Sequence, residues 1–246
     1  MDPTIQDQRA YYDNRWSKFE HANRIELQRL AAVIGYVARI ELPKDAAILD
    51  LGCGRGWSTN ILGMFGRATG VDLSDTTKAK ERFPHCEFIT ADALTWKGPQ
   101  AAFDLVVSIE VIEHIDLNSQ AEFIRMIREL LKPGGYVILT TPNKPTMNAI
   151  AGGGRTWSDQ PVENWIDAGQ LTGLLRSAGF QVEAQTSVVL GIASKGLYRI
   201  VNSASLQRAL GSIGAARLWE RLALAANFGL HLAILARKGT EASRQS

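Results

Sequence analysis

The stretch Ala47-Ile48-Leu49-Asp50-Leu51-Gly52-Cys53-Gly54-Arg55-Gly56 decides the fold of this chain. An apolar run that breaks into alternating glycines is typical of a buried parallel strand feeding a tight turn, because glycine lets the backbone turn sharply and approach a ligand closely. A second apolar run, Ala68-Thr69-Gly70-Val71, ends at Asp72. The two runs together predict a nucleotide-like ligand at the first turn.

The spacing of the glycines indicates which class of nucleotide-like ligand the turn binds. A dinucleotide-binding turn follows G-x-G-x-x-G and sets a helix N-terminus against a pyrophosphate, whereas this turn follows G-x-G-x-G with Asp50 before it. A carboxylate at that place repels a phosphate and suits a ligand that carries an ammonium and a sulfonium. Asp72 is expected to accept hydrogen bonds from both hydroxyls of a ribose. Asp92 is expected to accept from an adenine amino group, or to cap a short helix that begins near Leu94.

Five motifs occur in the order found in class I S-adenosylmethionine-dependent methyltransferases: LDLGCGRG, GVDLS, ADA, FDLVVSIEVIEH and LLKPGGYVILTTPN. Over roughly residues 45–190 the chain resembles that family, and in motif it is nearest to the small-molecule O-methyltransferases of ubiquinone-like pathways. The resemblance implies S-adenosyl-L-methionine as cofactor and S-adenosyl-L-homocysteine as its product. The predicted cofactor-binding residues are Asp50, Gly52, Cys53, Gly54, Gly56, Asp72, Leu73, Asp92, Ala93 and Ile109.

Apolar runs alternate with helical segments from the first glycine turn onward, which predicts an α/β fold with a doubly wound, seven-stranded, mostly parallel sheet. Lys132-Pro133-Gly134-Gly135 is predicted to end a helix and turn into the fifth strand. The strand that precedes the C-terminus is inserted antiparallel in the family that the chain resembles. Strands are expected near 47–51, 68–72, 87–90, 103–109 and 135–140, from Phe180 onward, and over 229–237.

The chain is expected to form one domain with four segments. Residues 1–44 are predicted to form N-terminal helices, interpreted either as a lid over cofactor and acceptor or as ordinary packing onto the domain. Residues 45–190 form the S-adenosylmethionine-binding core, 191–226 a helical insertion, and 227–246 the last strand and tail. The insertion is interpreted in three ways: packing over the sheet edge or acceptor site, contact in a homodimer, or contact with a membrane surface or lipid-linked substrate.

Composition restricts the class of partner. The chain has 246 residues, 46% of them hydrophobic, which is enough for one large α/β domain with a continuous core. The 27 basic and 25 acidic residues leave a net charge of +2. The sequence lacks the basic stripe that would indicate a nucleic-acid partner, so none is expected. Two cysteines imply no disulfide framework. No signal peptide and no membrane span is predicted, so we expect a cytoplasmic protein.

The segment Ser108–His114 supplies the catalytic candidates His114 and Glu110. Methyl transfer is an in-line displacement that depends mainly on holding the acceptor close and aligned. A general base is needed only where an acceptor hydroxyl must lose its proton. If Glu110–His114 begins a helical turn, then Glu110, Glu113 and His114 share one face. His114 is then a base or an acceptor-orienting group, and a purely structural histidine is the alternative.

The same E-x-x-E-H pattern binds magnesium in the ubiquinone-pathway and small-RNA methyltransferases that it resembles. Magnesium prefers six ligands, mostly oxygen, and the RNA enzymes add a further histidine downstream. Here residues 160–165 are Gln-Pro-Val-Glu-Asn-Trp, without a histidine. The sequence therefore assigns no metal ligands, does not favour magnesium and weakens the case for an RNA acceptor.

These observations predict O-methylation of a small-molecule biosynthetic intermediate: a quinone precursor, a polyketide, a sugar or a lipid-linked glycan. The first alternative is an N- or C-methyltransferase of the same fold, in which His114 is dispensable. The second is a protein that binds S-adenosylmethionine and methylates nothing, because an intact cofactor site does not by itself prove turnover.

Overall fold

A computed structural model describes residues 4–18, 21–151, 160–190 and 196–239. Its centre is a seven-stranded sheet in the order β3-β2-β1-β4-β5-β7-β6. Every strand pair is parallel except those that β7 makes with β5 and β6, which confirms the predicted fold class. The strands are β1 Ala47–Leu51, β2 Arg67–Asp72, β3 Glu87–Thr90, β4 Phe103–Ile109, β5 Leu131–Pro142, β6 Phe180–Val188 and β7 His231–Lys238.

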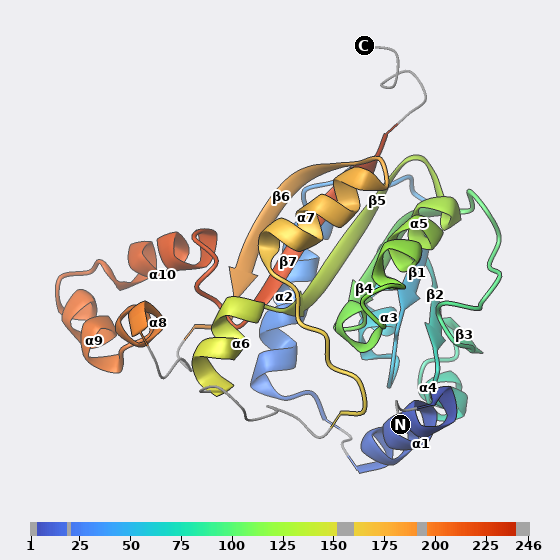
Figure 1. Cartoon of the computed structure of the whole chain (residues 1–246). Coiled ribbons are helices and arrows are strands. Elements are labelled where there is room, and N and C mark those ends of the chain that lie inside the picture. Colours follow the sequence, from blue (N-terminus) through green and yellow to red (C-terminus); the bar gives the residue numbers. More distant parts are fainter. Residues whose placement is uncertain (1–3, 19–20, 152–159, 191–195, 240–246) are drawn as a thin grey trace.

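Helices cover both faces of the sheet (Figure 1). Within the described residues they are α1 Ile5–Lys18, α2 Arg24–Val37, α3 Trp57–Leu62, α4 Thr77–Arg82, α5 Gln120–Leu130, α6 Lys144–Ala151, α7 Ala168–Ser177, α8 Gly196–Val201, α9 Ala204–Ser212 and α10 Ala216–Ala225, with a short 3-10 turn, η1, at Ile112–His114.

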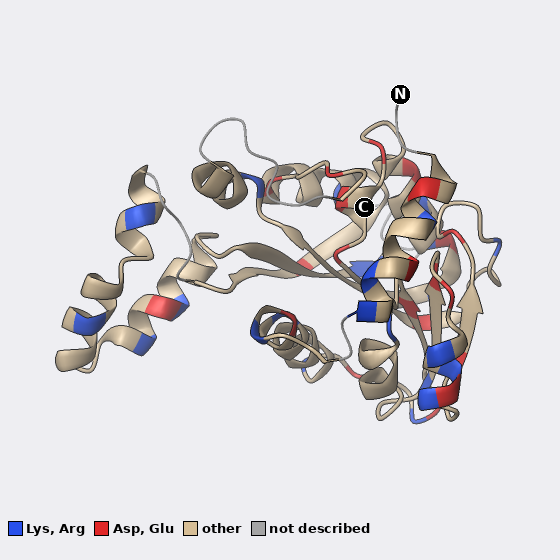
Figure 2. Cartoon of the chain, turned by 90° about the horizontal axis from the view of Figure 1, so that it is seen from below, with Lys and Arg blue, Asp and Glu red and all other residues tan. Residues whose placement is uncertain are grey.

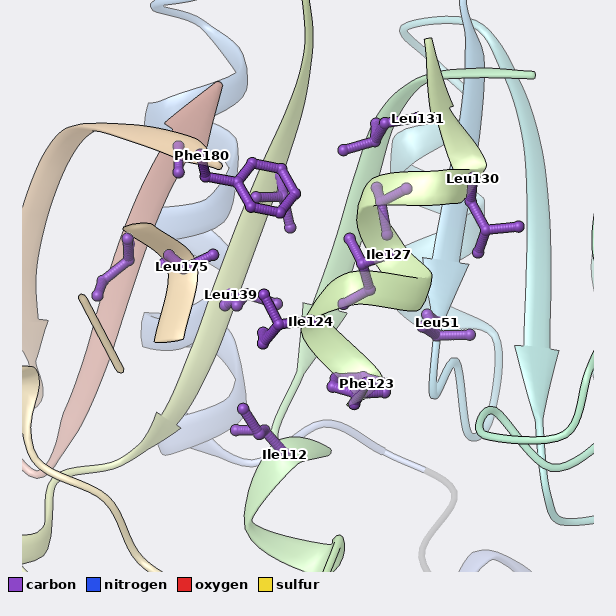
Figure 3. Close-up of a cluster of buried hydrophobic side chains, with 14 of the residues drawn as sticks. Leu51, Ile112, Phe123, Ile124, Ile127, Leu130, Leu131, Leu139, Leu175 and Phe180 are labelled. Atoms are coloured by element: carbon purple, nitrogen blue, oxygen red, sulfur yellow. The ribbon is translucent and has the colours of Figure 1, made fainter. Parts of the chain in front are cut away.

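Alternate residues of β1 serve two separate cores, as the pleat of a strand requires. Leu49 and Leu51 face the cluster built with α5 and α7. Ile48 faces the cluster built with α2 and α3. Figure 3 shows Phe123, Ile124 and Ile127 of α5 in the first cluster, beside Leu139 of β5. Because both faces of the central strands are buried, the ends of those strands are where a ligand can reach the sheet.

The fifth strand differs from its prediction. It begins at Leu131 rather than at Gly135, and the Lys132–Gly135 segment bulges within it. Phe103 pairs with Leu131, but the next pair is Leu105 with Tyr136. Gly134 adopts a φ of 77° at this bulge, a conformation that glycine reaches without steric cost. A turn was therefore predicted correctly at Lys132–Gly135, but it lies within β5 instead of before it.

The helices α8, α9 and α10 project from the edge of the sheet beyond β6 (Figure 1). Within the described residues, no helix combines the length and the apolar character that crossing a membrane requires.

Candidate active site

A cavity of about 680 Å³ lies at the carboxyl ends of the parallel strands, the edge where doubly wound sheets bind their ligands. Helices α1 and α2 complete its wall with side chains that include Tyr12, Trp16 and Arg29. The predicted cofactor residues that line this cavity are Gly52, Cys53, Gly54, Asp72, Leu73, Asp92, Ala93 and Ile109. Asp50 and Gly56 are not among its lining residues.

The glycine turn after β1 folds back tightly over β2. The amide N–H of Gly52 donates to the carbonyl of Val71 at 2.7 Å. Gly52 has a φ of 85°, and a Cβ there would lie 2.1 Å from the Val111 side chain. Only glycine fits this position, because any side chain would collide with the segment that follows β4. Gly56 is the N-terminal cap of α3 and does not border the cavity.

Asp50, which was predicted to bind the cofactor, lies outside the lining of the cavity. Its side chain is fully buried and one oxygen accepts hydrogen bonds from Ser58 and Thr59, each at 2.6 Å. Its other oxygen has no partner among the described residues. Burial raises the pKa of Asp50 to about 6, although the two hydroxyls oppose this change. Asp50 therefore ties the start of α3 to β1 beneath the turn.

Asp72 holds the glycine turn and also borders the cavity. Its Oδ2 accepts from the amide of Gly54 at 2.7 Å, and its Oδ1 accepts from the amide and hydroxyl of Ser74. Burial raises the pKa of Asp72, against the lowering effect of these hydrogen bonds. Each carboxylate oxygen can accept a further hydrogen bond, so the ribose role predicted for Asp72 is geometrically open.

Asp92 lines the cavity and caps a turn. Its carboxylate accepts from the amide of Leu94 at 3.0 Å and from the hydroxyl of Thr95 at 3.1 Å. The capping role that the sequence left open is therefore present, but the capped segment is a turn instead of a helix.

Glu110 is the centre of a buried ionic cluster at the other end of the cavity. Its Oε2 lies 2.8 Å from Nη1 of Arg29 and 2.7 Å from Nδ1 of His231, and its Oε1 accepts from the hydroxyl of Thr140 at 2.8 Å. Burial acts to raise the pKa of Glu110, but Arg29 and His231 outweigh it and lower that pKa to about 2. Glu110 is therefore a stable carboxylate. Both ring nitrogens of His231 are buried, and neither makes a hydrogen bond of regular geometry to a described residue, so its link to Glu110 is the close contact at Nδ1.

The expected helical face of Glu110, Glu113 and His114 does not form. Glu110 has a φ of 57°, outside the helical region, and the short turn begins two residues later at Ile112. Glu113 instead accepts from the hydroxyl of Thr141 at 3.0 Å. Burial and the nearby Glu110 raise the pKa of Glu113 well above its ordinary value.

His114 lines the cavity and contacts α1. Its Nδ1 is 2.8 Å from the carbonyl oxygen of Val162, so Nδ1 carries the proton and Nε2 is the acceptor. Its ring meets that of Tyr12 edge to face, with 5.7 Å between centroids. Burial lowers the pKa of His114, which keeps the imidazole neutral.

The geometry does not fit a magnesium ion. No group of three or more His, Cys, Asp or Glu side chains within the described ranges is arranged to hold a metal. Glu110, which the E-x-x-E-H pattern would supply as a ligand, is paired with Arg29 and His231. We therefore derive no step through a metal.

A profile of the methyltransferase domain matches residues 19–185 of the chain, a span that includes the glycine turn, Asp72, Glu110 and His114. The chain belongs to the methyltransferase domain family. This assignment confirms the family that the ordered motifs predicted.

Curated relatives of this chain are named as methyltransferases. A probable S-adenosylmethionine-dependent methyltransferase of Mycolicibacterium smegmatis is 32% identical over 148 residues, covering 58% of this chain and 55% of the relative. The mitochondrial ubiquinone biosynthesis O-methyltransferase of Rattus norvegicus is 27% identical over 192 residues, covering 68% of this chain and 53% of the relative. The chain thus spans about half the length of the curated relatives it matches.

A solved structure of the cyclase SpnF shares the fold, with a TM-score of 0.65 at 22% identity over 98% of both chains. At this identity the likeness shows the fold alone. It also illustrates that the methyltransferase fold does not fix the reaction, which has to be argued from the site.

Two residues of the site, Arg29 and His231, were missed at the sequence level. Arg29 belongs to the segment 1–44, which was predicted to be helical, and a single arginine within a helix carries no motif. His231 begins β7 and directly follows Leu230. The one available signal was the antiparallel last strand, whose first residue must lie at the carboxyl edge of the parallel strands.

Proposed function

We propose that this methyltransferase transfers the methyl group of S-adenosylmethionine to a hydroxyl of a small-molecule acceptor. The observation that carries the proposal is the contact of 2.7 Å between Nδ1 of His231 and Oε2 of Glu110, at a histidine that lines the cavity. A carboxylate this close to Nδ1 favours the tautomer in which Nδ1 carries the proton and Nε2 is the proton acceptor. Such a group is useful to an oxygen acceptor, which must lose a proton.

The cofactor end of the cavity fits an adenosyl ligand by its donor and acceptor set. Asp72 offers lone pairs to ribose hydroxyls, and Asp92 and Ala93, which line the same cavity, are assigned to the adenine. When bound, S-adenosylmethionine supplies a methyl group on a sulfonium, which is attacked in line. Cys53, whose pKa burial raises, stays a neutral thiol and does not compete as a nucleophile.

Proton transfer is assigned to His231 and Glu110. The acceptor hydroxyl donates its hydrogen bond to Nε2 of His231, and the proton moves to that nitrogen as the oxygen bonds to carbon. The imidazolium that forms is stabilised by the carboxylate of Glu110. Arg29 keeps that carboxylate ionised, as the low pKa of Glu110 reflects.

His114 is assigned an orienting role. Its neutral ring packs edge to face on Tyr12, and its Nε2 lies 3.7 Å from Oε1 of Glu113, a carboxyl whose pKa burial and the nearby Glu110 raise. Tyr12 and Trp16 of α1 stack 6.2 Å apart between centroids, and both line the cavity. An aromatic wall of this kind suits a flat or apolar acceptor, and α1 is proposed to serve as the lid.

The proposal is tested in two steps. Isothermal titration with S-adenosylmethionine and with S-adenosylhomocysteine measures cofactor binding, and we expect micromolar affinity for both. Transfer of a tritium-labelled methyl group is then measured with a panel of phenols, catechols, sugars and amines, each analysed for the methylated atom. Labelled ethers support the proposal, whereas labelled amines or carbon atoms indicate the alternative chemistry on the same fold. Cofactor binding without transfer to any acceptor would favour a non-catalytic binding protein.

A further inference from the structure

Helices α8, α9 and α10 form an arm, residues 196–225, beside the edge strand β6 (Figure 1). Its members hold one another in place: α10 packs on α9, and Nε1 of Trp219 donates to the carbonyl of Val201 in α8 at 3.3 Å. The rings of Tyr198 and Phe228 lie 5.1 Å apart and anchor α8 beside the chain that leads into β7. The three helices therefore pack together as one unit, and the same side chains remain exposed on its surface.

That outer surface is unusually apolar. Of the ten large apolar side chains that the described residues expose most, five belong to this arm: Leu197, Ile200, Ile213, Leu218 and Leu222, with exposures of 58–74%. The arm is 30 residues long, so it holds half of these side chains in about an eighth of the chain. Single exposed leucines need no explanation, but a concentration of this kind marks a surface that contacts something.

The same surface is basic. The arm carries four arginines, Arg199, Arg208, Arg217 and Arg221, against one acidic residue, Glu220. All four arginines are exposed, and none takes part in an ion pair within the part of the chain that the structure describes. Figure 2 shows these basic segments along the arm, separate from the mixed charges of the main body. A chain of net charge +2 thus concentrates three net positive charges on one projection.

We propose that this arm docks on an anionic membrane surface. Leucine and isoleucine side chains next to arginines are what an interfacial helix needs, because the apolar groups enter the acyl boundary while the guanidinium groups meet the lipid phosphates. On α10, Leu218 and Leu222 lie one turn apart and Arg217 and Arg221 immediately precede them. Each arginine near an anionic leaflet adds to the attraction.

Charge argues against a second copy of this chain as the occupant. A two-fold interface sets a surface against itself, so four arginines of one arm would face four of the other with only Glu220 from each to compensate. Like charges set against one another disfavour such an association. An anionic lipid surface has the opposite charge and accepts the apolar side chains as well.

The arm also adjoins the cavity. Helix α8 packs on α6. Met147 of α6 lines the cavity. Docking through the arm would therefore hold this side of the cavity close to lipid, although the docking itself does not depend on the proposed chemistry.

The test is co-sedimentation of the full chain with two kinds of vesicle: phosphatidylcholine alone, and phosphatidylcholine with phosphatidylglycerol at about 3:1. We expect binding to the anionic vesicles that weakens as salt is raised. Two double variants of the arm should each lower the partition coefficient at least about tenfold: Leu218→Ser/Leu222→Ser and Arg217→Ala/Arg221→Ala. The matched controls Met64→Ser/Leu117→Ser and Arg67→Ala/Arg125→Ala change exposed residues outside the arm, and they should bind as the wild type does.

Titration with S-adenosylhomocysteine accompanies every variant, so loss of the fold is distinguished from failure of docking. Vesicle binding is measured without a methyl acceptor, so failure of the proposed chemistry does not affect it. Equal binding to both kinds of vesicle, or arm variants that bind as tightly as the wild type, would overturn the inference. It would be overturned equally by light scattering that shows a dimer of the wild type and a monomer of the leucine variant, since the second copy would then cover the apolar side chains.

Discussion

The imidazole Nδ1 of His231 lies 2.7 Å from Oε2 of Glu110 because β7 runs against its neighbours. His231 is the first residue of β7 and pairs with Pro142, the last residue of β5. The antiparallel strand thus brings its N-terminal side chain to the edge where the parallel strands end. Glu110 follows β4 at the same edge, so the two meet in the cavity wall.

Replacing His231 should impair proton removal without impairing cofactor binding. For His231→Gln we expect turnover to fall about a hundredfold or more, with an unchanged affinity for S-adenosylhomocysteine measured by titration. The deficit should shrink for phenols of greater acidity, because an acceptor that ionises readily needs less help from a base. That dependence on acceptor acidity is not expected of a side chain that only supports the fold.

His114→Gln is the matched comparison. An orienting role predicts a higher KM and a smaller loss of kcat than His231→Gln shows. If His114→Gln instead produced the acidity-dependent loss and His231→Gln did not, the base would be His114, and the assignment made here would be wrong.

Removing Arg29 should destabilise the fold strongly. Arg29→Met leaves the Glu110 carboxylate buried without its main countercharge, which costs about 3–5 kcal/mol, measured as the free energy of unfolding in urea. Because the pKa of Glu110 is lowered in the folded chain, its carboxylate adds to the free energy of unfolding above the ordinary pKa of a glutamate. This stabilisation is lost as pH falls toward about 2. In Arg29→Met the deficit should therefore diminish in acid, where the carboxylate takes up a proton.

The double variant Arg29→Met/Glu110→Gln is the control, because it removes both charges together. It should recover most of the lost stability. A double variant as unstable as Arg29→Met would show that the guanidinium acts by packing and not by charge.

The sequence predicted the sheet and the cofactor end of the cavity well, since both depend on local patterns. The glycine turn, the acid that ends β2 and the alternation of apolar runs each report on backbone that is close in the chain. The cluster of Arg29, Glu110 and His231 could not be predicted in this way, because it joins α2, the end of β4 and the start of β7. The surroundings of Asp50 could not be predicted for a related reason: its spacing gives its strand position, but only its hydrogen bonds with Ser58 and Thr59 show which way its carboxylate is directed.

Asp72 should contribute to cofactor affinity and to the shape of the glycine turn. Asp72→Asn keeps one acceptor but loses the charge and one of its acceptor oxygens, and we expect S-adenosylhomocysteine to bind at least tenfold more weakly, which is about 1.4 kcal/mol. Asp92→Asn, in the same wall, provides the comparison. An Asp72→Asn protein with wild-type affinity would remove the ribose role from this residue.

Asp50 should make stability depend on pH in a direction opposite to that of Glu110. Its pKa of about 6 lies above the ordinary value of 3.8, so the folded chain favours the protonated form, and that stabilisation is lost as pH rises through about 6. The side-chain amide in Asp50→Asn does not titrate, so the stability of this variant relative to the wild type should increase by about 2 to 3 kcal/mol between about pH 4 and about pH 7. Urea unfolding of both proteins across this range measures the difference, in which the titration of all other groups cancels. If the stability of Asp50→Asn relative to the wild type stays constant or falls as pH rises, the Asp50 carboxylate is ionised over the whole range and its pKa is not raised by burial.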